Sequence, residues 1–275
     1  MDATENKTAY IPPVQLSENS RFQFKCHPGV PCFTQCCRGI DIMLTPYDVI
    51  RIKNRMGIPS EDFLALYTKP HLLETTDLPV ITLKMMDDER RSCPFVREDG
   101  CIIYEDRPTT CRYYPLGVAT LSYKEQQKDG FYIFINEPHC KGFNEKDQWT
   151  VAEWRKNQGV DIHDEINELW ADLIVKKKSI PKNVQLTEKT KKMFFTASYD
   201  MDGFRRFVFE SSFLTLYDID PKILAEIRSD EIALLRFGFK WLRWLMFKEG
   251  DFQLNADSLA KRQEAIQSRQ STDSL

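Results

Sequence analysis

All eight cysteines of this 275-residue chain lie between Cys26 and Cys140, and the rest of the chain contains none. Cysteines that only filled a core would be spread along the chain, so their confinement predicts one localised site. Four of them form the pattern CxxxxxCxxxCC, which runs from Cys26 to Cys37. This dense group constrains the first half of the chain to fold around its thiols.

Three kinds of chemistry use clustered cysteines: disulfide bonds, metal ligation and redox catalysis. Disulfides persist mainly in secreted proteins, and the polar N-terminus MDATENKTAY has no apolar segment typical of a signal peptide. No apolar run approaches the length that spans a bilayer. We therefore expect a cytoplasmic protein, in which clustered thiols bind metal or carry out catalysis.

The overall charge is nearly balanced, with 38 basic and 41 acidic residues and a net charge of -3. Such a chain presents no large field of one sign, so we expect neither nucleic acid nor a membrane as its partner. The expected partner is therefore an unidentified protein or a redox partner. The glycines are too far apart for a phosphate-binding GxGxxG loop, and neither HExxH nor GxSxG occurs.

The first half of the chain alternates short helices and strands. A helix is predicted over Pro46–Met56, with Thr45 as its N-cap and Gly57 at its end. A second helix follows Ser60 and ends before Pro70. Strands are predicted over 79–86, with Ile81, Leu83 and Met85 on one face, and over 118–123 and 131–135, which form a hairpin.

After Cys140 the pattern becomes helical. Thr150 and Glu153 form a capping box, and Gly159 ends that helix. An apolar stripe at helical spacing comprises Ile162, Ile166, Leu169, Trp170, Leu173 and Ile174. Later helices are predicted over 188–198, 204–209, 221–228 and 231–247.

The predicted fold class is therefore α+β. A small mixed cysteine-rich metal-binding module with short antiparallel strands is expected at residues 20–145. A mainly helical accessory region follows at 146–254 and packs on it. The polar segment 255–275 is expected to be a disordered tail.

The spacing of the cysteines bears on which metal they bind. Four thiolates suit either tetrahedral zinc or an iron-sulfur cluster. Zinc knuckles usually pair ligands two to four residues apart, and within the first group the adjacent Cys36 and Cys37 do not fit such a knuckle. The pattern CxxxCC also differs from the CxxxCxxC of radical enzymes. Eight thiols can complete two four-ligand sites, or fill one site and leave the others structural.

Two arginines lie near the second cysteine group. Arg107 and Arg112 can offset the negative charge of a four-thiolate site, which makes them candidate cofactor-binding residues. They can equally form ion pairs with Glu105 and Asp106. His27 and His139, each beside a cysteine, are further ligand candidates, although exposed or capping roles suit them better.

Four segments together resemble the YkgJ-type cysteine-cluster family, a zinc- or iron-chelating domain: the CxxxCC run, LTPYDVIRI, CPFVREDGCIIYEDRPTTCRYYP and HCKG. The resemblance covers about Phe24 to Phe143. It implies that the metal ligands are Cys26, Cys32, Cys36, Cys37, Cys93, Cys101, Cys111 and Cys140. The family's cysteine pattern is also similar to that of flagellin lysine-N-methylases, but nothing else in this chain indicates a methyl-donor site.

The leading hypothesis is a metalloprotein whose cysteines hold an iron-sulfur cluster of the four-iron (4Fe-4S) type, for electron transfer or to support a redox or group-transfer reaction. The alternative is a non-catalytic zinc module that shapes an interaction surface. A third hypothesis, metal delivery or storage, requires labile binding. Whether the protein is an enzyme stays open at this point.

Overall fold

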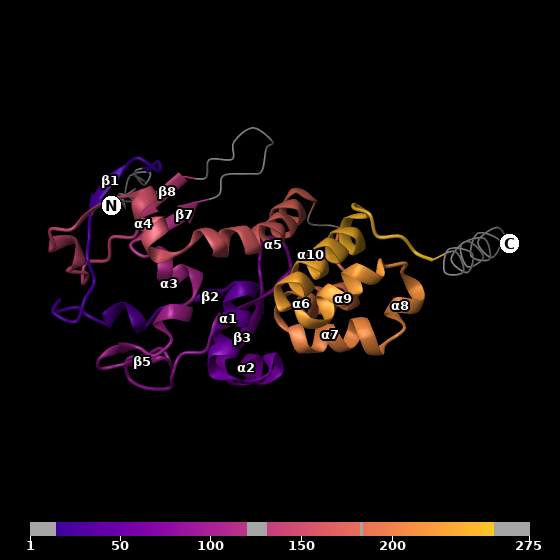
Figure 1. Cartoon of the computed structure of the whole chain (residues 1–275). Coiled ribbons are helices and arrows are strands. Elements are labelled where there is room, and N and C mark those ends of the chain that lie inside the picture. Colours follow the sequence, from indigo (N-terminus) through magenta and orange to yellow (C-terminus); the bar gives the residue numbers. More distant parts are fainter. Residues whose placement is uncertain (1–14, 120–130, 182–183, 256–275) are drawn as a thin grey trace, which may run out of the picture.

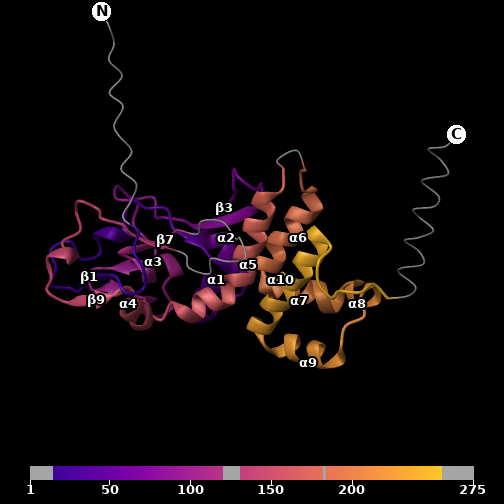
Figure 2. The same cartoon turned by 90° about the horizontal axis from the view of Figure 1, so that it is seen from above.

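The computed structural model describes residues 15–119, 131–181 and 184–255. Figure 1 shows the strands and short helices of the first half beside a group of longer helices from the second half. Viewed from above, the two parts lie along one elongated axis, with helix α5 (Asp161–Ser179) between them, as Figure 2 shows.

The first half contains short strands that pair in four small antiparallel sheets, in the orders β1-β9, β2-β4-β3, β5-β6 and β7-β8. The strands of this half are β1 (Arg21–Gln23), β2 (Met43–Leu44), β3 (Thr68–Leu72), β4 (Pro79–Leu83), β5 (Val96–Arg97), β6 (Gly100–Cys101), β7 (Leu116–Ala119) and β8 (Phe131–Phe134), and β9 (Gln148–Thr150), the partner of β1, lies at the start of the second half. The helices of this half are α1 (Pro46–Met56), α2 (Ser60–Tyr67) and α3 (Thr109–Tyr113), with 3-10 turns η1 (Gln35–Cys37), η2 (Tyr104–Asp106) and η3 (Gly142–Asn144). The α+β class is confirmed.

Helix α1 begins and ends where its capping residues predict. The Thr45 side chain accepts a hydrogen bond from the backbone N–H of Asp48, whose carboxylate accepts one from the N–H of Thr45. Gly57 ends the helix with φ of 65°, a left-handed conformation that glycine adopts without steric cost. The helix α2 that follows is also confirmed.

Strand β4 differs from the prediction in two respects. It ends at Leu83 instead of residue 86, and Val80, predicted on the face opposite Ile81, is buried as well. Both faces of the strand are covered, since Val80 on one face and Ile81 and Leu83 on the other are buried, and helix α6 (Glu188–Tyr199) packs against it. In the β7-β8 hairpin, Leu116 pairs with Phe134, and the predicted strand residues 120–123 lie outside the described residues.

The second half is helical, as expected. Its helices are α4 (Val151–Gln158), α5, α6 (Glu188–Tyr199), α7 (Met201–Glu210), α8 (Phe213–Leu216), α9 (Pro221–Ser229) and α10 (Glu231–Phe247). The short α8 was not predicted. The apolar stripe predicted on α5 is wrong at Ile162, which is 45% exposed. His163 and Asn167 are buried on that helix instead, because each has a polar partner inside the protein.

Two apolar clusters hold the fold together. The larger one joins Ile52, Phe63 and Ile81 of the first half to residues such as Trp170 and Leu235 of the second. The smaller cluster packs β1, β7 and β8 against α4. Since β1 also pairs with β9, both clusters and one sheet join distant parts of the chain.

The proposed division at residue 145 stays a prediction, and all but the first residue of the predicted tail lie outside the described residues.

No helix within the described ranges combines the length and the apolar composition that crossing a membrane requires.

Candidate metal centre

The first cysteine group lies on a series of tight turns between β1 and η1. The backbone N–H of Val30 donates to the carbonyl of His27, and that of Gln35 donates to the carbonyl of Cys32. Cys36 and Cys37 are consecutive residues of η1. These turns, in a segment that contains two prolines and one glycine, fold four thiols into a small volume.

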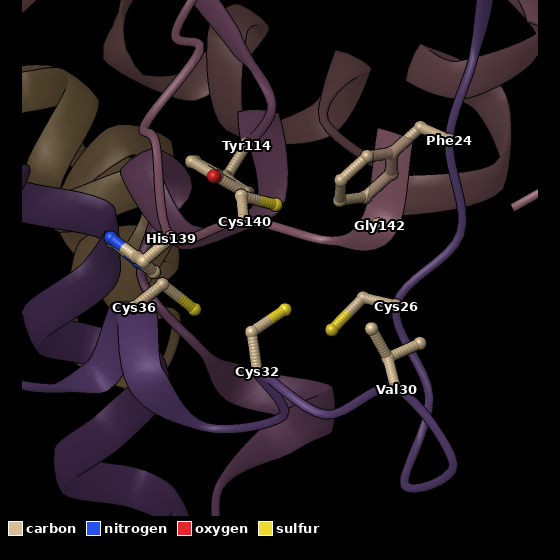
Figure 3. Close-up of a pocket in the computed structure, with 9 residues that line it drawn as sticks. All are labelled: Phe24, Cys26, Val30, Cys32, Cys36, Tyr114, His139, Cys140 and Gly142. Atoms are coloured by element: carbon tan, nitrogen blue, oxygen red, sulfur yellow. The ribbon is translucent and has the colours of Figure 1, made fainter. Parts of the chain in front are cut away.

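Four cysteines line one pocket, and we call them the outer set: Cys26, Cys32, Cys36 and Cys140. Figure 3 shows Cys26 and Cys32 of the loop before η1, and Cys36 of η1 itself, reaching into the same space, with Cys140 on the opposite side. The lining is completed by Phe24, Val30, Tyr114, His139 and Gly142. Cys26 is the exposed member of the set, while the other three are partly buried.

Cys140 reaches this pocket because two distant segments are held against each other. The backbone N–H of Lys141 donates to the Cys32 sulfur at 3.1 Å, and the N–H of Lys25 donates to the carbonyl of Gly142 at 3.1 Å. A Cβ atom at Gly142 would lie 2.6 Å from the ring of Phe24. Only glycine permits this approach.

The other four cysteines pack against the larger apolar cluster, and we call them the inner set: Cys37, Cys93, Cys101 and Cys111. The N–H of Cys93 donates to the carbonyl of Cys37 at 2.8 Å. Cys101 lies on β6 opposite Val96, and Cys111 lies in α3. The structure thus places on one apolar cluster cysteines that the sequence separates by up to 74 positions, from residue 37 to residue 111.

The acidity of the thiols reflects this clustering. Desolvation of its sulfur at the pocket, followed by the neighbouring thiols of Cys36, Cys32 and Cys140, raises the pKa of Cys26 to about 12. Burial also raises the pKa of Cys93 to about 11, and it raises the pKa of Cys111. Since thiolates are the metal-binding form, metal binding here must displace protons.

The adjacent pair Cys36 and Cys37 behaves differently. A hydrogen bond from the Cys37 thiol lowers the pKa of Cys36, and the same bond, together with burial, raises the pKa of Cys37. Cys36 lines the pocket, whereas Cys37 packs against the core. This pair marks the point where the two sets meet.

The two candidate arginines are both 7% exposed. Arg107 donates to the carbonyl of Tyr104 and to the Gln158 side chain, both at 2.5 Å. Arg112 donates to the carbonyls of Arg107, Gln158 and Glu105. Both guanidinium groups therefore brace the loop between Cys101 and Cys111 through backbone carbonyls, while the carboxylate of Asp106 pairs with Arg51.

Arg107 also acts on the inner set through its charge. It favours the thiolate of Cys101, although burial is the larger effect and raises the pKa of that thiol overall. The role of Arg107 and Arg112 in holding a cofactor stays a prediction.

The histidines beside the cysteines contact carboxylates. His27 Nε2 lies 3.3 Å from Glu145, and its Nδ1 accepts a hydrogen bond from the N–H of Gly29. His139 lies at the pocket, but its Nε2 is 3.3 Å from the carboxylate of Glu137. The side chains at the pocket that are available to bind a metal are therefore mainly the thiols.

A buried polar network behind the inner set was not predicted. Asp48, which is fully buried, accepts hydrogen bonds from the N–H and the hydroxyl of Thr109 at 2.8 and 2.7 Å. Thr109 lies 2.9 Å from His163 Nδ1. Because the hydroxyl proton goes to Asp48, Thr109 accepts from His163. From the sequence, Asp48 is only an acidic residue in the first turn of α1, and nothing local signals its burial.

The donor set can be compared with what each metal requires. Four sulfurs around one zinc ion, each about 2.3 Å from it, lie about 3.8 Å apart. Among the residues that the structure describes, no three or more histidine, cysteine, aspartate or glutamate side chains converge closely enough for one metal ion. In an iron-sulfur cluster the thiolates bind different iron atoms and are spread more widely. The chemistry of each set, four thiols, fits such a cluster.

Of the comparisons with known proteins, the one with family models supports metal binding by the cysteines. No curated protein and no solved structure matches the chain. Residues 25–141 match the CxxCxxCC family model, described as a "Putative zinc- or iron-chelating domain". The match includes all eight cysteines, whereas the helices from α4 onward lie outside it. The segment that carries the outer and inner sets is thus the part of the chain that is similar to the cysteine-cluster domain of the CxxCxxCC family.

Proposed function

We propose that this protein holds an iron-sulfur cluster of the four-iron type and serves in electron transfer. The observation that supports it most is the outer set, in which four thiols from two distant segments line one pocket. Four thiolates are the usual ligands of such a cluster. The adjacent Cys36 and Cys37, which do not fit a zinc knuckle, favour a cluster over zinc.

The surroundings of the pocket also suit a redox centre. When bound, an iron-sulfur cluster takes up and releases single electrons. Its potential depends on hydrogen bonds to the sulfurs and on solvent exposure. Here the N–H of Lys141 donates to Cys32, and Cys26 is exposed. The pocket therefore combines a polar contact to sulfur with an edge that an electron-transfer partner can approach.

Metal and sulfide analysis tests the proposal. Protein purified without oxygen is expected to be brown, with iron and acid-labile sulfide in equal amounts and a broad visible absorption. An aliquot exposed to air is the control, because oxidation should bleach a cluster but leave zinc in place. Colourless protein with stoichiometric zinc and no sulfide would contradict the proposal.

A zinc-dependent structural module is the second candidate. It is supported by the inner set, which packs directly against the larger apolar cluster, where a structural metal would stabilise the fold. In that case chelation should unfold the first half of the chain, and circular dichroism would record the loss. Retention of the native spectrum after complete metal removal would contradict this candidate.

A further inference from the structure

We propose that the eight cysteines form two separate metal centres, one held by the outer set and one by the inner set. This inference rests on the proposed function, because it assigns ligands to the metal which that function requires. It goes further in dividing the ligands and in assigning the adjacent residues Cys36 and Cys37 to different centres.

The two sets occupy different surroundings. The nine residues that line the pocket include the whole outer set and no cysteine of the inner set. The inner set instead packs against the larger apolar cluster, whereas Cys140 of the outer set packs against the smaller one. Each set contains four thiols, the number that a tetrahedral ion or a cluster takes. Eight thiols would exceed the ligand number of a single centre.

The geometry of η1 explains how neighbouring residues can serve different centres. A 3-10 helix has about three residues per turn, so consecutive side chains point in directions about 120° apart. Cys36 accordingly faces the pocket, and Cys37 faces the core. The N–H of Cys93 then ties the inner set to the carbonyl of Cys37 at 2.8 Å.

The two sets adjoin at η1. Cys36 lines the pocket, and the next residue, Cys37, packs against the larger apolar cluster. The two centres therefore adjoin across the Cys36–Cys37 peptide, whose Cα atoms are about 3.8 Å apart.

The two centres should also differ in accessibility. The outer set includes the exposed Cys26, while the inner set includes Cys93, which is 9% exposed. Solvent and chelators should therefore reach the outer centre first. The inner centre, packed on the core, should be lost only as the structure opens.

Paired substitutions test the division by metal content. Wild-type protein prepared without oxygen is expected to contain about eight iron and about eight sulfide per chain. Cys26→Ala/Cys140→Ala removes two ligands of one set and should retain about half of the iron. Cys140→Ala/Cys111→Ala removes one ligand of each set and should lose nearly all of it. Equal losses in the two double variants would overturn the proposal.

The adjacent cysteines provide the sharper test. In reduced protein, the electron paramagnetic resonance signal left in Cys36→Ala should match that of Cys140→Ala. The signal left in Cys37→Ala should match that of Cys111→Ala. Identical residual signals in Cys36→Ala and Cys37→Ala would contradict two centres. If inner-set variants fail to fold, the outer-set variants still decide, because they must keep about half of the metal and a native circular dichroism spectrum.

Failure of this inference can be distinguished from failure of the proposed function. A wild-type content of about four iron per chain would overturn the two centres and leave the proposed function standing. About two zinc ions without sulfide, reduced to about one in Cys26→Ala/Cys140→Ala, would overturn the iron-sulfur function and leave the two centres standing.

Discussion

Asp48 illustrates how a single buried side chain supports the inner set. Its carboxylate accepts hydrogen bonds from Thr109 and from the N–H of Thr45, so it connects the start of α1 to the start of α3. Cys111 lies two residues beyond Thr109 in α3. The carboxylate therefore holds the helix that presents one of the inner thiols.

Replacing Asp48 tests that role. In Asp48→Asn the amide nitrogen must face at least one backbone N–H, because the carboxylate accepts such bonds on both oxygens. Leaving a buried donor unsatisfied costs about 1–3 kcal/mol. We expect the free energy of unfolding, measured by denaturant titration, to fall by about that amount.

The control for this substitution is Asp41→Asn, which changes a carboxylate that is 82% exposed and pairs with Arg91. Exposed ion pairs contribute about 0–1 kcal/mol, so this variant should stay close to wild type. An Asp48→Asn protein as stable as Asp41→Asn would show that the buried network does not support α3.

At the scale of elements, α2 is tied to α7 by reciprocal hydrogen bonds. The Ser60 N–H donates to the Asp202 carboxylate at 2.7 Å, and the N–H of Asp202 donates to the Ser60 hydroxyl at 3.0 Å. The same hydroxyl donates to Asp200 at 2.6 Å. These bonds join the start of a helix in the cysteine-rich half to the start of one in the helical half.

This contact predicts a dependence of stability on pH. Burial opposes ionisation of Asp202, but the Ser60 N–H and the charge of Lys53 outweigh it and lower its pKa. A carboxylate with a lowered folded-state pKa stabilises the fold above its unfolded pKa of about 3.9, and that contribution is lost as pH falls through the folded value. The difference in free energy of unfolding between wild type and Asp202→Asn should therefore shrink from pH 6 to pH 3.

Asp62→Asn serves as the control, since it changes an exposed carboxylate of the same helix α2. Its difference from wild type should stay small across the range. If the difference in free energy of unfolding between wild type and Asp202→Asn does not change with pH, ionisation of Asp202 does not stabilise the contact between α2 and α7.

The whole molecule is held together by clusters that cross the midpoint of the chain. Ile52, Phe63 and Ile81 belong to the same apolar cluster as Trp170 and Leu235, and β1 pairs with β9. Removing the second half would expose this apolar surface to water and leave β1 without its partner. Burial of such surface is the main force that drives folding.

Truncation tests this dependence. A chain that ends at residue 145 should show no cooperative unfolding transition and little native circular dichroism. The control is a chain that ends at residue 255, which retains both apolar clusters and should unfold cooperatively. Cooperative unfolding of the shorter chain, at a stability near that of the control, would instead show that residues 20–145 fold as an independent domain.

Local signals explain which elements could be predicted. Thr45, Gly57 and the capping box at Thr150 mark helix ends through hydrogen bonds within a few residues, so the sequence alone locates α1 and α4. The two-residue strands β2, β5 and β6 were missed because their pairing depends on partners that the local pattern does not reveal. The burial of His163 was missed for the same reason, since its partner Thr109 lies 54 positions away.

The candidate site divides in the same way. The confinement and density of the eight cysteines, with the motifs around them, were sufficient to indicate a metal-binding domain. The type of side chain determines which atoms can bind a metal, and residue types can be taken from the sequence. Which thiols share a pocket was decided only by the tertiary structure. Cys36 and Cys37 diverge because a 3-10 turn rotates one residue against the next, and Cys140 reaches Cys32 because Gly142 allows two distant segments to approach. Both depend on backbone geometry, which cysteine spacing does not encode.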